Sequence, residues 1–174
     1  MIIQFCGLSG SGKSTIAGRV KELLKEEGHK VEIIDGDEYR KVLCPDLGFS
    51  KQDRNQNIRR LAFVASKLSA YDIVAIICAI NPYDEIRQEV KAIYPHVITI
   101  YINCNLETLV ERDTKGLYKK ALLPDGHPDK ITNLTGVNDP FEPPNEPDLV
   151  LNTADESINE SVAKLANYIM QFLK

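Results

Sequence analysis

A glycine-rich run near the start of the chain carries the clearest chemical signal. Residues 7–15 read Gly-Leu-Ser-Gly-Ser-Gly-Lys-Ser-Thr, which matches the phosphate-binding pattern G-x-x-x-x-G-K-[ST] at every fixed position. Glycines let the backbone turn so that successive N–H groups point at phosphate oxygens, and the helix that follows adds the positive end of its dipole. The pattern predicts that the phosphates of ATP are bound by Gly7, Ser9, Gly10, Ser11, Gly12, Lys13, Ser14 and Thr15.

Two residues of this loop have separate roles in the expected chemistry. The Lys13 ammonium reaches the β and γ phosphates, and the Ser14 hydroxyl is a ligand for the Mg²⁺ that bridges them. Such loops occur in kinases, GTPases and motor-type ATPases. The guanine-reading sequence N-K-x-D is missing, because residues 152–155 read Asn-Thr-Ala-Asp. A small-molecule kinase is therefore favoured.

A pair of carboxylates follows the second apolar run of the chain. Asp35 and Asp37 flank Gly36 directly after residues 31–34. A lone Asp-Gly pair is more simply interpreted as a turn. Here the two acids come at the carboxyl end of an expected strand, where α/β sheets bind ligands. We therefore predict that Asp35 helps to hold Mg²⁺ and that Asp37 orients or deprotonates an acceptor hydroxyl, with Asp35 as the alternative for that second role.

The elements that must position these groups alternate along the chain. Short runs rich in Ile and Val, typical of strands buried on both faces, occupy residues 2–5, 31–34, 73–80, 97–102 and 149–151. Segments with helical spacing occupy residues 14–27, 52–70, 83–93, 106–112 and 156–173. The alternation predicts one α/β domain over residues 1–174, with five parallel strands, right-handed crossovers and flanking helices.

One stretch breaks this alternation. Residues 113–148 show no sustained periodicity, and they contain six prolines and a group of lysines. Long segments of this kind inside a compact domain are usually functional lids or disordered. We predict a lid over residues 113–148 that excludes water during transfer.

The bulk properties argue against several other classes of protein. The formal net charge of −4 disfavours nucleic acid and anionic membranes as partners. The four cysteines form no C-x-x-C pair and no cysteine–histidine cluster with zinc spacing, so we expect reduced, buried thiols. The start of the chain is too short and uncharged for a signal peptide, and no apolar run approaches the ~20 residues of a membrane helix. We expect a cytoplasmic protein.

Several longer motifs resemble one family, the adenylyl-sulfate (APS) kinases. The phosphate-binding loop is followed by Asp-Gly-Asp at residues 35–37, Asp-Leu-Gly-Phe-Ser at 46–50 and Asp-Arg-Asn-Gln-Asn-Ile-Arg-Arg at 53–60. Residues 112–120 read Arg-Asp-Thr-Lys-Gly-Leu-Tyr-Lys-Lys, and residues 135–144 read Thr-Gly-Val-Asn-Asp-Pro-Phe-Glu-Pro-Pro. The resemblance is collinear over nearly the whole chain. It implies a phosphate-binding-loop kinase in a three-layer sandwich, which uses ATP and Mg²⁺ to phosphorylate the 3′ hydroxyl of APS and forms a homodimer.

The resemblance also implies roles for individual side chains. Guanidinium forks suit phosphate-type oxygens, so Arg40 and Arg54 resemble anion clamps for APS, and Asn57 lies one helical turn after Arg54. Phe49 and Leu134 resemble the two walls of the slot for the APS adenine. The three other candidates are Arg112 against the adenine of ATP and the lid cations Lys115 and Lys119. Arg59, Arg60 and Lys120 are expected to be solvated charges.

Several positions depart from the family pattern. The family motif D-G-D-N-[IV]-R reads Asp-Gly-Asp-Glu-Tyr-Arg at residues 35–40. Leu134 stands where the family usually has phenylalanine, and Asn81 and Asp84 stand where it usually has serine and a basic residue. A kinase of another anionic nucleotide, such as a cytidine diphosphate analogue, would keep the arginines and change the base slot. A catalytically idle nucleotide-binding module is disfavoured, because Lys13, Asp35 and Asp37 are all present.

The first prediction concerns Lys13. Replacing Lys13 with alanine removes the cation that faces the transferred phosphoryl group, and we expect turnover to fall by more than about tenfold, or ~1.4 kcal/mol of barrier. Steady-state rates and circular dichroism of both proteins check this, since the fold should be unchanged. A smaller loss of turnover would contradict the assigned role.

Overall fold

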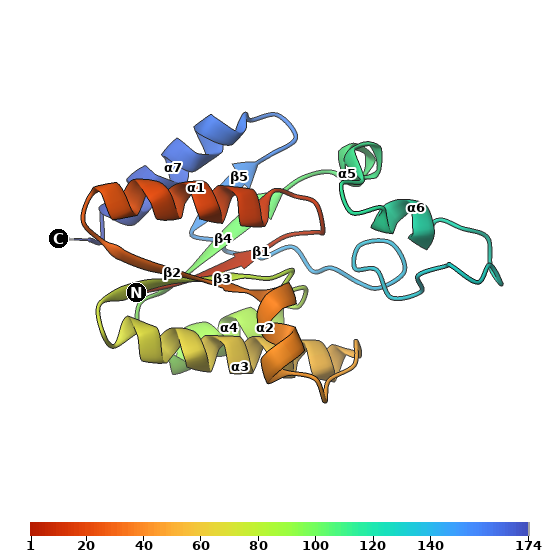
Figure 1. The fold of residues 1–174 in the computed structure, drawn as a ribbon, viewed down its shortest axis with the longest axis horizontal. Coiled ribbons are helices and arrows are strands. Elements are labelled where there is room, and N and C mark those ends of the chain that lie inside the picture. The colour runs from red at the N-terminus through yellow and green to blue at the C-terminus, as the bar shows by residue number, and fades with distance from the viewer. Residues whose placement is uncertain (174) are drawn as a thin grey trace.

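A parallel sheet between two helical layers forms the body of the molecule (Figure 1). The computed structural model describes residues 1–173. Its strands are β1 (Ile2–Cys6), β2 (Lys30–Asp35), β3 (Ile73–Cys78), β4 (Val97–Asn103) and β5 (Leu149–Asn152). Its helices are α1 (Lys13–Glu26), α2 (Gly36–Leu43), α3 (Lys51–Ser69), α4 (Asp84–Ile93), α5 (Leu106–Arg112), α6 (Leu117–Ala121) and α7 (Ile158–Met170). The predicted α/β fold with five parallel strands is confirmed.

The order of the strands places the chemistry at one edge of the sheet. The order is β2-β3-β1-β4-β5, so the chain moves to either side of β1. The phosphate-binding loop therefore leaves the central strand, and the Asp35–Asp37 pair leaves a strand only two positions away. Ligands of open α/β sheets bind at such switch points, outside the carboxyl ends of the strands.

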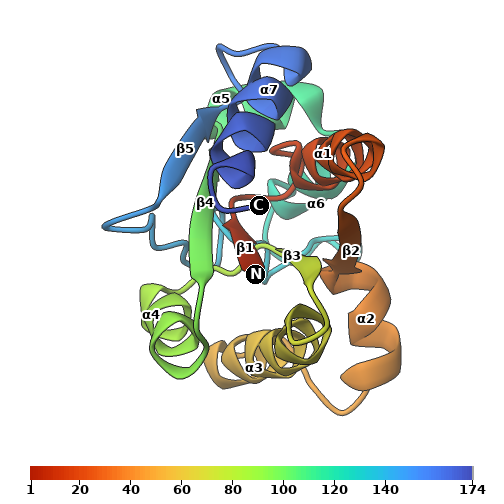
Figure 2. The ribbon, with the colours of Figure 1, turned by 90° about the vertical axis from the view of Figure 1, so that its left-hand side faces the viewer.

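Apolar residues on both faces of the sheet make the core. On one face, Ile3 and Phe5 of β1 pack with α1 and α7; on the other, Ile2 of β1 and Ile77 of β3 pack with α3 and α4. Figure 2 shows these two layers on opposite sides of the strands. Burial on both faces explains why the strands contain continuous apolar runs instead of an alternating pattern.

Two helices were not predicted from the sequence. Helix α2 begins directly after Asp35, whose side chain accepts hydrogen bonds from the backbone N–H groups of Asp37 and Glu38. Asp35 is therefore a helix N-cap, and the alternative of a simple Asp-Gly turn is wrong. Helix α6 lies within the segment expected to lack regular structure, so that expectation is wrong for Leu117–Ala121. Its first turn is held by Asp113, which accepts from the N–H groups of Tyr118 and Lys119.

The carboxyl-terminal part of the segment 113–148 is fastened along α4 and β4. The Glu142 N–H donates to the Pro82 carbonyl at 2.8 Å, and the buried Arg87 side chain donates to the Glu142 carbonyl at 2.6 Å. Farther along, the Asp148 N–H donates to the Thr99 carbonyl at 2.9 Å. Residues 142–148 therefore follow a fixed path into β5, whereas most side chains of residues 122–130 are exposed. Within residues 1–173, no helix has the length and apolar character needed to cross a membrane.

The second prediction concerns hydrogen exchange in this segment. Residues 122–130 have mostly local backbone hydrogen bonds, so their amides should exchange quickly without ligands and gain protection when a non-hydrolysable ATP analogue and APS are both bound. The amides of Glu142 and Asp148, bonded to other elements, should be protected in both states. Amide exchange followed by mass spectrometry checks this. Equal protection of residues 122–130 with and without ligands would mean that this segment is permanently packed.

Candidate active site

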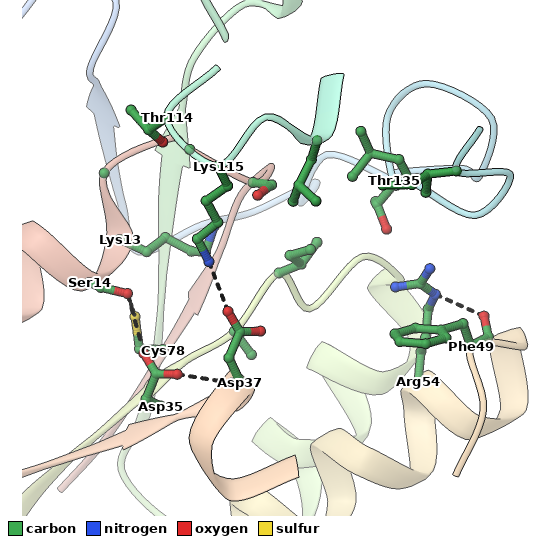
Figure 3. Close-up of a pocket in the computed structure, with 18 of the residues that line it drawn as sticks. Lys13, Ser14, Asp35, Asp37, Phe49, Arg54, Cys78, Thr114, Lys115 and Thr135 are labelled. Atoms are coloured by element: carbon green, nitrogen blue, oxygen red, sulfur yellow. Dashed lines mark hydrogen bonds and ion pairs between the residues drawn. The ribbon is translucent and has the colours of Figure 1, made fainter. Parts of the chain in front are cut away.

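One cavity of about 580 Å³ joins most of the predicted site residues. It lies between the phosphate-binding loop, the carboxyl ends of β2 and β3, the start of α3 and the segment 114–135. In Figure 3, Lys13, Ser14 and Asp35 lie at one end, Phe49 and Arg54 lie at the other, and Asp37 lies between them. Its lining includes Ser9, Gly10, Gly12, Lys13, Ser14, Thr15, Asp35, Asp37, Phe49, Arg54, Lys115 and Leu134.

The phosphate-binding loop needs glycine at its ends. Gly7 has a φ of 154°, and a Cβ atom there would lie 2.5 Å from the Ile102 carbonyl oxygen. Gly12, which precedes α1, has a left-handed φ of 98°. Two side chains from distant elements bind outward-facing carbonyls of the loop. The Tyr118 hydroxyl donates to the Ser9 carbonyl at 2.7 Å, and the Thr153 hydroxyl donates to the Ser11 carbonyl at 2.9 Å.

The Lys13 side chain is folded back onto its own loop. Its ammonium donates to the carbonyls of Gly7 at 2.9 Å and Leu8 at 2.6 Å. Burial lowers the pKa of Lys13 to about 8, and the nearby Lys115 ammonium acts in the same direction. An anionic phosphate would favour the charged form and so restore a higher pKa.

The residues predicted to hold the metal ion lie together. The Ser14 hydroxyl donates to an Asp35 carboxylate oxygen at 3.3 Å, and its oxygen lies 3.5 Å from the Cys78 sulfur. One hydroxyl and one carboxylate are hard oxygen donors, and Mg²⁺ typically takes one or two such protein ligands beside phosphate oxygens and water. The donor set therefore fits Mg²⁺.

Asp37 faces the cavity from the first turn of α2. Its carboxylate accepts from the Lys115 ammonium at 2.8 Å, and this hydrogen bond raises the pKa of Lys115. Both side chains are more than half exposed, so the pair is worth little as a stabilising contact. Lys115 is thereby placed over the cavity between its two ends (Figure 3).

Arg54 holds together the far end of the cavity. Its guanidinium donates to the Phe49 carbonyl at 3.0 Å and the Asn133 carbonyl at 2.8 Å, and it is ion-paired with Asp139 at 2.7 Å. Arg54 is only 8% exposed. The guanidinium carbons of Arg54 and Arg40 lie 5.4 and 4.6 Å from the centroid of the Phe49 ring. Arg54 therefore positions both the loop that carries Phe49 and the segment that carries Leu134.

Two predicted acceptor residues lie in an adjoining recess. Arg40 and Asn57 line a space of about 90 Å³ that shares Asp37, Phe49 and Arg54 with the main cavity. Arg40 also donates to the carbonyls of Leu47 and Gly48. The structure thus brings both arginines to one end of the site.

Leu134 is buried and lines the cavity as part of a small apolar cluster. The buried members of this cluster are Cys104, Leu109, Tyr118, Ala121 and Leu134. Besides Arg40 and Asn57, the sequence-predicted residues that do not line the main cavity are Gly7, Ser11, Arg112 and Lys119. Arg112 donates to the Thr153 carbonyl at 2.9 Å, and Lys119 is exposed on α6. Their proposed contacts with ATP stay predictions.

The sequence interpretation missed several residues of the site. Cys78, Thr114 and Thr135 line the cavity, and Asp139 pairs with Arg54. Tyr118 and Asp139 stand inside the two runs that carry the family resemblance, at residues 112–120 and 135–144. The resemblance drew attention to these runs, but their side-chain partners lie far away in sequence. Arg60, expected to be a solvated charge, is partly exposed and binds Asp46 at the surface through two hydrogen bonds of 2.6 and 2.7 Å.

The third prediction concerns the pH dependence of nucleotide binding. Because Lys13 has a pKa of about 8 and bound phosphates favour its charged form, ATP affinity should fall as pH rises through about 8. Binding of a non-hydrolysable ATP analogue should take up little proton at pH 7 and a larger fraction at pH 8.5. Calorimetry in two buffers of different ionisation enthalpy measures this uptake. In the Lys13→Gln variant the uptake at pH 8.5 should vanish, and persistence of the wild-type value would assign the proton to another group.

Comparison with known proteins agrees with this geometry. The family model described as adenylylsulphate kinase matches residues 1–152. The chain is 45% identical to the adenylyl-sulfate kinase of Halothermothrix orenii, over 96% of this chain and 88% of that protein. It is 41% identical to the adenylyl-sulfate kinase of Microcystis aeruginosa, over 95% of this chain and 88% of that one. The structure of the Mycobacterium tuberculosis APS kinase CysC in complex with AMPPNP and APS superposes with a TM-score of 0.87 at 36% identity, covering 97% of this chain and 96% of that chain. The chain belongs to the adenylyl-sulfate kinase family.

Proposed function

We propose that this protein transfers the γ-phosphoryl group of ATP to the 3′ hydroxyl of APS, giving 3′-phosphoadenylyl sulfate. The alcohol group of the ribose is thus the acceptor. One observation carries the proposal: a single cavity connects the phosphate-binding loop to two carboxylates and then to an aromatic slot bordered by a buried arginine. Family membership and the relatives named as adenylyl-sulfate kinases support the same acceptor.

The phosphate end of the cavity is suited to in-line phosphoryl transfer. The backbone N–H groups of the loop bind the phosphates, and Lys13 exchanges the carbonyls of Gly7 and Leu8 for phosphate oxygens. Ser14 and Asp35 would hold Mg²⁺, which when bound neutralises part of the phosphate charge. Lys115 faces the same space and adds positive charge where the transferred group passes.

The two carboxylates have different surroundings, and this favours different roles. Asp35 accepts hydrogen bonds from Asp37 N, Glu38 N and the Ser14 hydroxyl, so its oxygens are largely committed. The Asp37 carboxylate is exposed to the cavity and binds only Lys115 among the residues that the structure describes. Asp37 is therefore free to orient the acceptor hydroxyl and receive its proton.

The arginine end of the cavity is suited to an anionic nucleotide. Phe49 offers a ring face for a base, and Leu134 supplies apolar surface that also lines the cavity. Arg40, Arg54 and Asn57 border the adjoining recess and would bind the phosphosulfate group. Arg54 already binds two carbonyls and Asp139, which leaves its second terminal nitrogen, Nη1, for the acceptor.

The departures from the family pattern affect the acceptor end unequally. Asp84 pairs with Arg87 at 3.0 Å and accepts from Asn145, so it fastens residues 142–145 and does not line the cavity. Asn81 is buried beside the acceptor recess, and Leu134 lines the cavity itself. Because these last two positions lie at the acceptor end, another anionic nucleotide, such as a cytidine diphosphate analogue, is the alternative acceptor. The lid over residues 113–148, the single domain over 1–174, the homodimer and the cytoplasmic location stay predictions.

The fourth prediction tests the acceptor directly. The wild-type enzyme should have a higher kcat/KM for APS than for a cytidine analogue. Leu134→Phe should keep or improve use of APS, by up to roughly 1 kcal/mol at the lower end of base–aromatic stacking. The kcat/KM for APS and for the cytidine analogue is measured in wild type and variant. The wild-type ratio checks the first statement, and the change in kcat/KM for APS checks the second.

A matched variant separates the slot from general effects of a larger side chain. Leu122 is 58% exposed and lies in the same segment, and it does not line the cavity. Leu122→Phe should leave the ratio unchanged. A wild-type ratio that favours the cytidine compound would reject APS as the acceptor while leaving the kinase assignment standing.

A further inference from the structure

Tyr118 joins the two ends of the site: its hydroxyl binds the phosphate-binding loop, and its ring packs in the cluster on the acceptor side. Tyr118 lies on α6 and is only 2% exposed. Its hydroxyl donates to the carbonyl of Ser9, in the phosphate-binding loop, at 2.7 Å. Its ring belongs to the same apolar cluster as Leu134, the residue that lines the acceptor side of the cavity.

The hydrogen bond to Ser9 fixes the direction of a neighbouring N–H group. The peptide between Ser9 and Gly10 is planar and trans, so its C=O and N–H bonds point in opposite directions. Holding the Ser9 carbonyl outward therefore turns the Gly10 N–H toward the cavity that Gly10 lines. Because such N–H groups bind phosphate, a rotation of this peptide would weaken ATP binding.

Tyr118 is itself held in place from both sides. The Asp113 carboxylate accepts from the Tyr118 N–H at 3.0 Å and so fixes the start of α6. On the ring side, Leu134 stands next to Asn133, whose carbonyl binds Arg54, and near Asp139, which is ion-paired with Arg54. An unbroken set of contacts thus leads from the arginine end of the cavity to a peptide of the phosphate-binding loop.

We propose that Tyr118 is a positioning residue that couples acceptor binding to ATP binding. An acceptor that settles against Leu134 and Arg54 restrains the cluster around the Tyr118 ring. The restrained ring holds the Ser9–Gly10 peptide in the orientation that binds phosphate, so each substrate should tighten the binding of the other. This inference rests on the proposed function for the identity of the acceptor. The expected effect of Tyr118 on ATP binding does not depend on which acceptor is used.

Thr153 offers a matched control. Its hydroxyl donates to the Ser11 carbonyl at 2.9 Å. Thr153 therefore holds a carbonyl of the phosphate-binding loop two residues after the one that Tyr118 holds. Thr153 follows β5, it does not line the cavity and it is not a member of the cluster around Leu134. Loss of its hydroxyl should weaken nucleotide binding without changing the coupling.

The fifth prediction uses three variants that each lose one side-chain hydroxyl. These are Tyr118→Phe, Thr153→Val and, as a distant control on α7, Tyr168→Phe. The dissociation constant of a non-hydrolysable ATP analogue is measured by calorimetry with and without saturating APS, and melting temperatures confirm that each variant is folded. In wild type and Tyr168→Phe, APS should tighten the analogue by at least about fivefold.

Tyr118→Phe and Thr153→Val should each weaken the analogue alone by about two- to tenfold, as expected for one lost hydrogen bond. Only in Tyr118→Phe should the effect of APS fall to nearly none. Unchanged affinity of Tyr118→Phe for the analogue alone would overturn the proposal whatever the acceptor is. A wild-type coupling factor that survives in Tyr118→Phe, or an equal loss of coupling in Thr153→Val, would also overturn it.

The failure of the proposed function would look different. In that case the wild-type enzyme would not turn over APS. The measurement on the analogue alone would still decide whether Tyr118 positions the phosphate-binding loop.

Discussion

The site depends on how the outward carbonyls of the phosphate-binding loop are satisfied. A loop that turns its N–H groups toward phosphates must turn its carbonyls away from them, and buried carbonyls without donors are costly. Here the donors come from three directions: Lys13 within the loop, Tyr118 from α6 and Thr153 after β5. The loop is therefore held by elements from the middle and the end of the chain. In the proposed reaction Lys13 also binds the phosphates, so this donor would leave the carbonyls when ATP binds. Burial lowers the pKa of Lys13 in its phosphate-free position.

A second buried cation organises the acceptor end. Removing Arg54 from water carries a desolvation cost, which the Asp139 carboxylate and two backbone carbonyls offset. The Arg54 guanidinium contacts the loop before α3, the segment around Leu134 and a face of the Phe49 ring. A residue that resembles an anion clamp is thus also a structural tie. Substitution of Arg54 would be expected to change the walls of the slot as well as its charge.

A third buried cation, Arg87, anchors the carboxyl-terminal end of the segment 113–148. Arg87, 1% exposed, binds Asp84 and the carbonyls of Asn81 and Glu142. It thereby fastens the path from residue 142 onward to the end of β3 and the start of α4. At the other end, Asp113 fixes the start of α6 and Tyr118 binds the phosphate-binding loop. The exposed residues 122–130 lie between these two anchored ends, which explains why a lid would be shorter than the aperiodic stretch in the sequence.

The strands, most helices and the phosphate-binding loop could be predicted from the sequence, because they follow from local patterns of apolar residues and glycines. It also placed Asp35 and Asp37 beside the loop, since parallel strands end at one edge of the sheet. Helices α2 and α6 escaped prediction because they are short and are started by the side chains of Asp35 and Asp113. The pairing of Arg54 with Asp139, and of Tyr118 with Ser9 109 positions away in sequence, became visible only in the folded structure. Such partners are chosen by the packing of whole elements, and no local pattern of residue types records that packing.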